Sequence, residues 1–509
     1  MGALRLDGDG LQLADLAAVL SDDPPELVVT EDAWERVDGS REAVERVLEC
    51  DDTVYGVNTG FGRLSRVRID SHRLEELQRN LILSHATGVG QPLSLAVSRL
   101  MLVLRIQAII KGCSGVRRVL VERLLQLYAH DLIPVIPEQG SVGASGDLAP
   151  LAHMALVLFG IGEVWSGDER RSAETALREA NVDTLALTAK EGLALINGTQ
   201  CMTAIGVATW LHATTLVKTA DVAASLSLEA LRGSAEPFRE EVHLARPHAG
   251  QVATAANMRR LLEGSEITLS HLGCDKVQDP YSLRCVPQVH GTVRDALSYG
   301  QKVLEVEVNA ATDNPLVMSG GSIVSAGNFH GQPVSQAMDL LGIALATLAN
   351  ISERRIETMV NPDLSGLPAF LAHDPGMNSG FMIPQVVAAS LASENKSLAH
   401  PASIDSIPTS ANREDHVSMG VTAARHARDI CANTAKVLGI EVICGAQGLS
   451  FDRGLRAGSG PEAAFAAVRA RVPELESDRW LAPDVVVAEE LVSSGTILAA
   501  VEAVIGQLE

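Results

Sequence analysis

Five long apolar stretches constrain the fold of this chain more than any other feature of its sequence. They run over about residues 200–232, 287–311, 330–360, 380–399 and 417–443, with apolar side chains at helical spacing. Several exceed twenty residues, which is longer than the usual helix of a globular protein. We therefore predict a mainly α fold with a long central helical bundle at about 201–450.

The rest of the chain falls on either side of this bundle. Residues 1–200 predict a smaller N-terminal region, with helices at about 94–111 and 115–130 and glycine-rich loops between helices. Residues 451–509 predict two C-terminal helices, with Pro461 as an early helical residue. The chain is 46% hydrophobic but only 3% aromatic, so its core must be built from Ala, Leu, Val and Ile.

The charge and the cysteine content argue against several classes of function. A formal net charge of −22, without a basic cluster, disfavours nucleic acid binding. Seven scattered cysteines, odd in number and without a CxxC pair, favour a reducing compartment over a disulfide framework or a structural zinc site. No cluster of metal ligands has a sensible spacing, so we expect that no metal is required.

Neither a signal peptide nor a membrane span is predicted. Arg5 and Asp7 interrupt the N-terminus, where a signal peptide would need an apolar run. The uncharged stretch from Gly192 to Val217 contains Asn197 and His212, which favours a buried helix with a polar entry loop over a membrane span. We therefore expect a soluble, cytoplasmic protein.

The segment Gly140–His153 carries the strongest chemical signal. It reads GSVGASGDLAPLAH, an irregular loop that leads into an apolar helix. Its centre, Ala144-Ser145-Gly146, suits backbone cyclisation: the Gly146 nitrogen attacks the Ala144 carbonyl, and loss of two waters turns Ser145 into a methylidene carbon. Glycine leaves the attacking nitrogen unhindered and lets the backbone bend. The product would be an electrophile made from the chain itself.

This segment resembles the signature of the aromatic amino acid ammonia-lyases, through Gly143–Leu148 and Pro150–His153. The resemblance extends from about Tyr55 to Gly448. It implies the helical architecture of fumarase/aspartase-like lyases and a 4-methylidene-imidazol-5-one (MIO) group formed from Ala144, Ser145 and Gly146. It also implies a homotetramer whose active sites combine loops from three subunits.

Two polar loops precede and follow the signature. Tyr55 heads the glycine-rich segment YGVNTGFG, which could be a flexible turn or a mobile lid that carries the tyrosine into a site. Asn197 could be an ordinary turn residue or a buried amide in need of a partner. By resemblance, Tyr55 is the catalytic base and Asn197 hydrogen-bonds the prosthetic group or the substrate amine.

The segment QDPYSLRC at residues 278–285 is the second strong signal. A guanidinium at Arg284 could grip a carboxylate through two hydrogen bonds, as an amino acid substrate requires. The resemblance assigns carboxylate binding to Arg284 and places Gln278 and Tyr281 beside the prosthetic group. It also assigns Phe329 and Met382 to the apolar wall of the pocket; we assign His330 a structural role.

Two positions indicate which amino acid is the substrate. By resemblance, both lie at the end of the pocket that receives the aromatic ring. Ser84-His85 resembles the histidine-specific version of this site, where phenylalanine-type and tyrosine-type enzymes show Phe-Leu and His-Leu. Those enzymes usually have Gln where this chain has Glu414, and a carboxylate can accept a hydrogen bond from an imidazole N–H. Glu414 could instead be an acid favoured by a helix N-terminus.

Two neighbours of Glu414 are less clear. Arg413 departs from the Gln that histidine-specific relatives usually carry, and it could pair with Glu414 and lower its basicity. His416 is equally compatible with a structural role and a role in the site.

The expected reaction is the non-oxidative elimination of ammonia from L-histidine to give trans-urocanate, the first step of histidine degradation. Either the substrate amine or its imidazole ring attacks the carbon derived from Ser145. A phenylalanine or tyrosine ammonia-lyase or an aminomutase is the nearest alternative. A helical scaffold without catalysis would have no reason to retain Ala-Ser-Gly, Tyr55 and Arg284 together.

Overall fold

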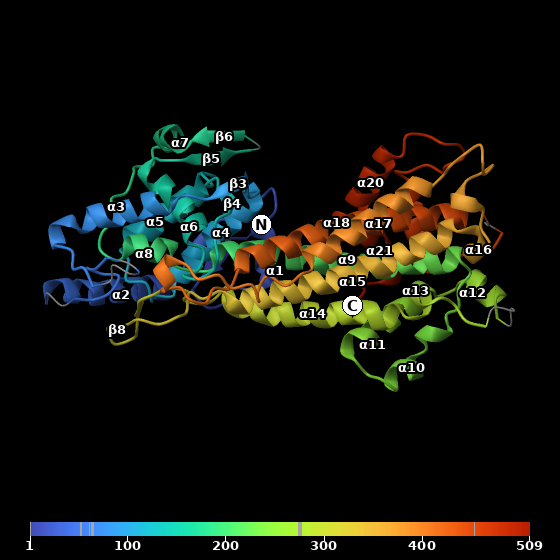
Figure 1. Cartoon of the computed structure of the whole chain (residues 1–509), viewed down its shortest axis with the longest axis horizontal. Helices are drawn as coiled ribbons and strands as arrows, with labels where there is room; N and C mark the ends of the chain where they lie inside the picture. Colours follow the sequence, from blue (N-terminus) through green and yellow to red (C-terminus); the bar gives the residue numbers. More distant parts are fainter. Residues whose placement is uncertain are drawn as a thin grey trace. The chain divides into compact units, whose positions relative to one another are not determined.

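The computed structural model describes residues 2–50, 53–60, 62, 66–167, 169–272, 277–451 and 454–509. Helices dominate these residues (Figure 1), so the predicted mainly α fold is confirmed. The chain divides into two compact units. The first comprises Met1–Ala208, Gly300–Asp339 and Pro401–Arg425, and the second comprises Thr209–Tyr299, Leu340–His400 and His426–Glu509. Segments distant in sequence therefore meet in each unit.

The first unit combines short helices with small β ladders. Its helices are α1 (Leu13–Val19), α2 (Glu31–Glu49), α3 (Leu74–His85), α4 (Leu95–Ile110), α5 (Arg118–Ala129), α6 (Leu148–Leu156), α7 (Ala173–Glu179) and α8 (Glu191–Ile196). The ladders pair β1 (Leu4–Leu6) with β2 (Leu27–Val29), β3 (Val89–Pro92) with β4 (Pro137–Gln139), β5 (Glu163–Ser166) with β6 (Glu169–Ser172), and β7 (Leu316–Val317) with β8 (Ile323–Val324). The first ladder is parallel and the others are antiparallel.

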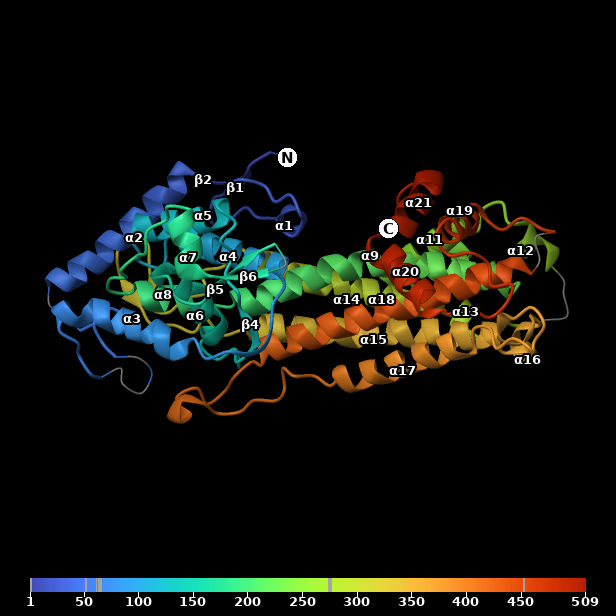
Figure 2. The ribbon, with the colours of Figure 1, turned by 90° about the horizontal axis from the view of Figure 1, so that it is seen from above.

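Helix α4 forms the centre of this unit. Every residue from Ser98 to Ile110 is buried, as expected for a helix that is apolar on all sides. Helices α3, α6 and α8 pack against one another (Figure 2). Their packing fixes the positions of His85 at the end of α3, the loop before α6, and Asn197 directly after α8.

The five predicted apolar stretches are confirmed as long helices. They are α9 (Gln200–Ala230), α14 (Val286–Glu307), α15 (Gln332–Val360), α17 (Met382–Leu398) and α18 (Gly420–Ser450). Helix α18 continues past the predicted end at residue 443 because its glycines allow close packing. A Cβ at Gly445 would lie 3.0 Å from the Leu226 Cβ of α9, and a Cβ at Gly448 would lie 2.8 Å from the Ala230 Cβ. These glycines serve close helix packing and do not end the helix.

The C-terminal region has three helices, where the sequence predicted two. They are α19 (Ser459–Arg469), α20 (Ala482–Ser493) and α21 (Thr496–Ile505). Gly495, with a φ of +73°, separates α20 from α21. This left-handed residue divides an apolar run that reads as one continuous helix, which explains the wrong prediction.

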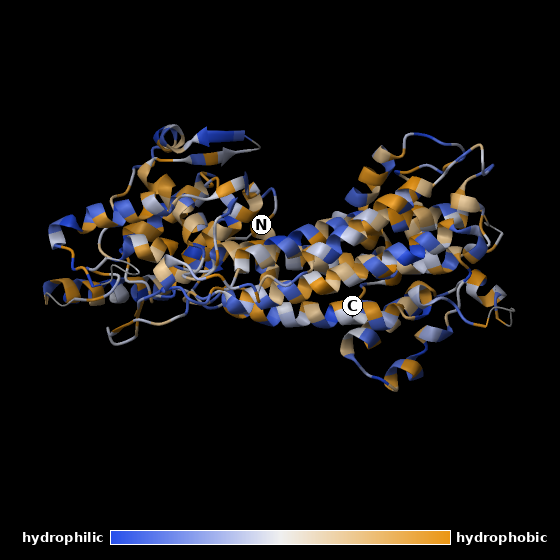
Figure 3. Cartoon of the chain, viewed as in Figure 1, coloured by the Kyte–Doolittle hydropathy of each residue, from blue (hydrophilic) through white to orange (hydrophobic). Residues whose placement is uncertain are grey.

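One described helix, α15, is long and apolar enough to cross a membrane. However, 72% of its most apolar window is buried inside the protein, which is typical of a core helix in a soluble protein. Polar residues alternate with apolar ones along the long helices (Figure 3). The stretch from Gly192 to Val217 forms the end of α8, a polar turn and the start of α9, as predicted.

A buried ion pair links two long helices of the second unit. The Arg355 guanidinium of α15 pairs with the Glu441 carboxylate of α18, and both side chains are inaccessible to solvent. Ser227 and Ser352 donate further hydrogen bonds to the same carboxylate, at 2.7 and 2.5 Å. A charge in such a place is tolerated only because its partners are present.

We expect Glu441→Leu to lower the free energy of unfolding by about 3–5 kcal/mol, because it leaves the Arg355 guanidinium buried without a counter-charge. The double variant Arg355→Met/Glu441→Leu removes both charges and should recover most of this loss. Urea unfolding followed by circular dichroism measures both. A double variant no more stable than Glu441→Leu would contradict this account.

Candidate active site

A cavity of about 730 Å³ in the first unit contains many of the residues singled out in the sequence. Its lining includes Tyr55, His85, Ala144, Ser145, Asn197, Phe329 and Glu414. These residues come from six separate parts of the chain, and all of them belong to the first unit. The fold therefore brings together the tyrosine loop, the Ala-Ser-Gly loop and the expected ring-binding residues.

The Ala-Ser-Gly loop lies against the turn that follows α8. The Asp147 amide donates a hydrogen bond of 2.7 Å to the Gly198 carbonyl oxygen, and the Asn197 side-chain amide donates one of 2.9 Å to the Ser145 carbonyl oxygen. Gly146 has a φ of +73°, and a Cβ there would lie 2.2 Å from the Gly198 oxygen. Position 146 therefore has no room for a side chain.

Arg105 holds this turn through hydrogen bonds to residues 197 and 200. The sequence analysis did not predict this role. Its Nη1 donates to the Asn197 carbonyl oxygen at 3.0 Å and to Gln200 Oε1 at 2.9 Å. The side chain is fully buried, and burial lowers the pKa of Arg105 to about 10, so it stays charged at neutral pH. The sequence signal for Arg105 was its position as one of two arginines, with Arg99, within the apolar run of α4.

Asp147 ties the same loop to the first turn of α9. Its carboxylate accepts hydrogen bonds from the Ser141 hydroxyl at 2.8 Å and from the Met202 amide at 2.9 Å. Complete burial raises the pKa of Asp147 to about 7, although these hydrogen bonds act in the opposite direction. The pKa of Asp147 therefore lies well above that of an exposed aspartate.

The residues before Ala144 are held by hydrogen bonds from the segments that precede α15 and α18. The Gly143 carbonyl oxygen accepts from the Ser418 hydroxyl at 3.0 Å and from the Gly331 amide at 3.3 Å. The Met419 amide donates to the Val142 oxygen at 2.8 Å. The loop is thus held at both ends by main-chain contacts to other segments of the first unit.

Glu414 lies directly beside Ser145. The Ser145 hydroxyl donates a hydrogen bond of 3.0 Å to Glu414 Oε1, and the Thr409 hydroxyl donates to Oε2. Arg413 also lines the cavity, but no ion pair between Arg413 and Glu414 exists among the described residues. The Glu414 carboxylate is therefore oriented by hydroxyl groups.

His85 presents one ring nitrogen as an acceptor. Its Nδ1 lies 2.8 Å from the Leu81 carbonyl oxygen, so Nδ1 carries the proton and Nε2 is left with a lone pair. Burial lowers the pKa of His85, while the Leu81 carbonyl and the Glu414 charge raise it less strongly. His85 is accordingly a neutral imidazole at physiological pH.

The environment of Tyr55 disfavours its phenolate form. Burial raises the pKa of Tyr55 and the Glu414 charge raises it further, while a hydrogen bond with the Gly62 backbone opposes both. The sequence left two routes open, in which neighbours either lower this pKa or drive the proton transfer. Among the described residues of the first unit, the net effect on the Tyr55 pKa is to raise it. Phe61, part of the same glycine-rich segment, lies outside the described residues.

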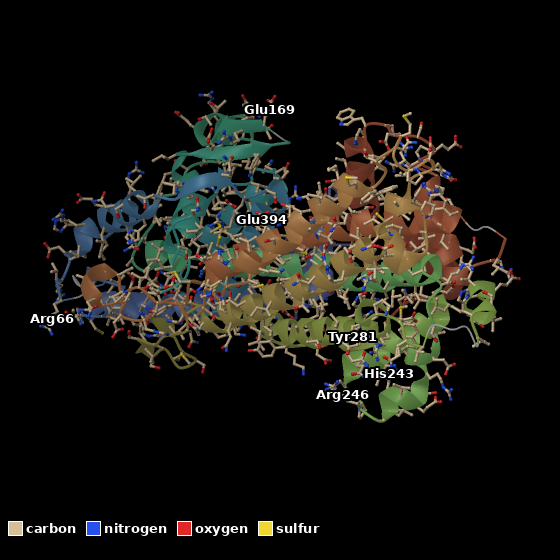
Figure 4. All side chains as sticks on the ribbon, turned by 45° about the vertical axis from the view of Figure 1, so that its right-hand side comes forward. Arg66, Glu169, His243, Arg246, Tyr281 and Glu394 are labelled. Atoms are coloured by element: carbon tan, nitrogen blue, oxygen red, sulfur yellow. The ribbon has the colours of Figure 1, made fainter. Side chains whose placement is uncertain are left out.

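Four candidate residues belong to the second unit and are not among those that line the cavity: Gln278, Tyr281, Arg284 and Met382. Tyr281 is 70% exposed (Figure 4), and the Arg284 guanidinium lies 4.5 Å from the centre of its ring. The buried Arg284 Nε has no hydrogen-bond partner among the described residues. Of the four, Arg284 and Tyr281 contact each other.

His330 and His416 stack on each other where they line the cavity. Their ring centroids are 5.8 Å apart and the rings are nearly parallel, at 3°. His330 Nε2 also lies 3.1 Å from the His416 carbonyl oxygen. This contact joins the segment before α15 to the segment that carries Glu414, in keeping with a structural role for His330.

Known proteins resemble this chain in both sequence and structure. Residues 11–470 match the aromatic amino acid lyase family. The histidine ammonia-lyase of Myxococcus xanthus is 51% identical over 499 residues, which cover 98% of each chain. The crystal structure of histidine ammonia-lyase from Trypanosoma cruzi matches with a TM-score of 0.91 at 41% identity, over 99% of this chain and 95% of that one. A tyrosine aminomutase from Streptomyces globisporus matches with a TM-score of 0.95 at 38% identity, over 100% of both chains.

We expect Gly146→Ala to lower the free energy of unfolding by about 2–4 kcal/mol, from left-handed backbone strain together with the clash against Gly198. Gly264→Ala is the matched control, because Gly264 has a φ of +76° and no atom within 4 Å of a Cβ placed there. The control should lose only about 1–2 kcal/mol. Chemical unfolding compares the two variants, and equal losses would show that the contact with Gly198 is unimportant.

Proposed function

This chain belongs to the aromatic amino acid lyase family, and from that premise we propose that it eliminates ammonia from L-histidine to give trans-urocanate. It is accordingly a carbon–nitrogen lyase. The observation that carries the choice of substrate is the pair of acceptors, His85 Nε2 and the Glu414 carboxylate, in the same cavity as Ser145.

We infer that the reactive group is MIO, formed from Ala144, Ser145 and Gly146. The loop has features that suit this cyclisation. No described residue hydrogen-bonds the Gly146 nitrogen or the Ala144 carbonyl oxygen, so the two groups that must react are free. The absence of a side chain at Gly146 allows the close approach to Gly198. Once formed, this group supplies an electrophilic carbon that withdraws electrons from the bound amino acid.

Asn197 is placed to assist this withdrawal of electrons. Its side-chain amide already donates to the Ser145 carbonyl oxygen at 2.9 Å, and negative charge would develop on that oxygen. A donor that is oriented before the reaction stabilises the charge without further reorganisation. Arg105 keeps the turn in place through the Asn197 main chain.

The ring end of the cavity distinguishes histidine from other aromatic amino acids. An imidazole ring carries N–H groups that can donate to His85 Nε2 or to Glu414, whereas a phenyl ring offers none. With phenylalanine both acceptors would be desolvated without a partner, which is a strong penalty. This argument favours histidine over the phenylalanine or tyrosine lyase and aminomutase alternatives.

Tyr55 is the candidate that removes the β-proton. Because its pKa is raised, only a small fraction of Tyr55 is phenolate near neutral pH. Acidification of the β-proton by the electrophile would therefore have to drive the transfer to the Tyr55 oxygen.

We further propose that the active site is completed by other copies of the chain in a homotetramer. The partly buried Arg284 and the exposed Tyr281 form a pair that is suited to a substrate carboxylate but does not line the cavity of the first unit. An apolar hollow of about 300 Å³ between α14 and α15, lined by Val289, Val293 and Ile343, offers a surface for contact between copies. We place the protein in the cytoplasm, in keeping with the free state of all six described cysteines.

Purified protein should convert L-histidine to trans-urocanate, which is followed by its ultraviolet absorbance, and should give little product from phenylalanine or tyrosine. Ser145→Ala cannot form the electrophile, so its urocanate production should fall below detection. Ser322→Ala, in the exposed turn between β7 and β8, is the matched control and should remain fully active. A Ser145→Ala variant as active as the parent would overturn the proposed function.

Shared active sites predict complementation between two inactive variants. Ser145→Ala and Arg284→Ala should each be inactive alone, but their co-expression should restore part of the activity, because mixed tetramers contain some intact sites. Co-expression of Ser145→Ala with Asn197→Ala is the control and should restore none, since both residues line the same first-unit cavity. Equal recovery in the two mixtures, or none in the first, would contradict shared sites.

A further inference from the structure

Both oxygens of the Glu414 carboxylate have hydroxyl partners. Ser145 Oγ donates to Oε1 at 3.0 Å, and Thr409 Oγ1 donates to Oε2. An ionised carboxylate only accepts hydrogen bonds, so each hydroxyl must direct its proton at Glu414. The two donors together fix the plane of the carboxylate, with Oε1 towards Ser145 and Oε2 towards Thr409.

Thr409 is itself held in place by a tight loop. The Thr409 amide donates to the Glu414 carbonyl oxygen at 3.0 Å, and the Glu414 amide donates to the Thr409 oxygen at 3.4 Å. Between them, Ser410, Ala411 and Asn412 all have positive φ, from 52° to 64°. Three successive left-handed residues are strained and persist only where the surroundings enforce them. The hydrogen bond from the Thr409 hydroxyl to Glu414 Oε2 is one of the contacts that close this loop.

The two hydrogen bonds differ in what happens to them during cyclisation. Formation of the electrophile removes the Ser145 hydroxyl as water, so Oε1 loses its donor. Thr409 takes no part in that chemistry and remains on Oε2. Glu414 then has one satisfied oxygen and one free acceptor, directed at the carbon where the substrate reacts.

We propose that Thr409 is a positioning residue for the reaction, which anchors Glu414 Oε2 so that Oε1 can accept an N–H from the substrate imidazole. This inference rests on the proposed function. Tyr55, His85 and Glu414 line the same cavity, so the orientation of this carboxylate bears on both other polar groups at the ring end. A carboxylate released from Thr409 would rotate, and its negative charge would move with it.

The first test compares three variants by their turnover of L-histidine. Thr409→Val keeps the branched shape but removes the hydroxyl, and kcat/KM should fall about 10-fold, as expected for a lost hydrogen bond to a charged group. Thr409→Ser keeps the hydroxyl and should stay within about 2-fold of the parent. Thr214→Val is the matched control, because the Thr214 hydroxyl donates only to the Trp210 carbonyl oxygen within α9, and it should leave turnover unchanged.

The second test separates a positioning role from a purely structural one. Because Thr409 acts through Glu414, its effect should disappear once Glu414 has been replaced. Thr409→Val should weaken the binding of trans-urocanate, measured by calorimetry, about 10-fold in the parent but less than about 2-fold in Glu414→Gln. An equal loss in both backgrounds would overturn the proposal, as would full activity of Thr409→Val.

Two further observations keep the result interpretable. The mass of the peptide that contains Ser145 should be the same in Thr409→Val and the parent, which excludes a defect in cyclisation as the cause. If the valine variant does not fold, Thr409→Ala removes the same hydroxyl and takes its place. A parent protein that forms no urocanate would refute the proposed function, whereas an active parent with independent effects of Thr409 and Glu414 would refute this inference alone.

Discussion

The site depends above all on the close contact between Gly146 and Gly198. The Gly198 carbonyl oxygen accepts the Asp147 amide, and it leaves no space for a side chain at position 146. This contact brings the loop before α6 against the turn after α8, so that the Asn197 amide reaches the Ser145 oxygen. The same packing of α3, α6 and α8 places His85 in the cavity. Gly146 and Gly198 thus set the distance between the Ala-Ser-Gly loop and the Asn197 side chain.

Buried charges surround this contact and hold it in place. Arg105 binds the turn through its main chain, and a buried Lys190–Asp313 pair at 2.8 Å contributes a second charged contact in the same unit. Each of these buried charges bonds a fixed partner, and such bonds favour one arrangement of the chain. Asp147 differs from them, because its pKa of about 7 leaves it able to gain or lose a proton.

The sequence predicted the long helices well because their apolar spacing continues over many turns, as in α9 and α15. It missed the division of α20 from α21, which depends on one glycine with positive φ. At the site, the sequence motifs predicted roles for Tyr55, Ser145, Asn197 and Glu414 from their residue types, and the structure places all four in the lining of one cavity. Arg105 and Thr409 were not predicted. Their importance comes from partners far away in the chain or from a strained loop, and neither leaves a periodic pattern. That Arg284 and Tyr281 belong to the second unit could not be predicted from the sequence, because it depends on how the chain folds.

The proposed chemistry requires three residues of a bent loop, Ala144, Ser145 and Gly146, to become an electron-withdrawing ring. The most direct measurement is the mass of the peptide that contains Ser145, taken from the purified, unmodified protein. We expect a peptide lighter than its encoded sequence by the mass of two waters. A peptide with its full encoded mass, and therefore an intact Ser145 hydroxyl, would contradict it.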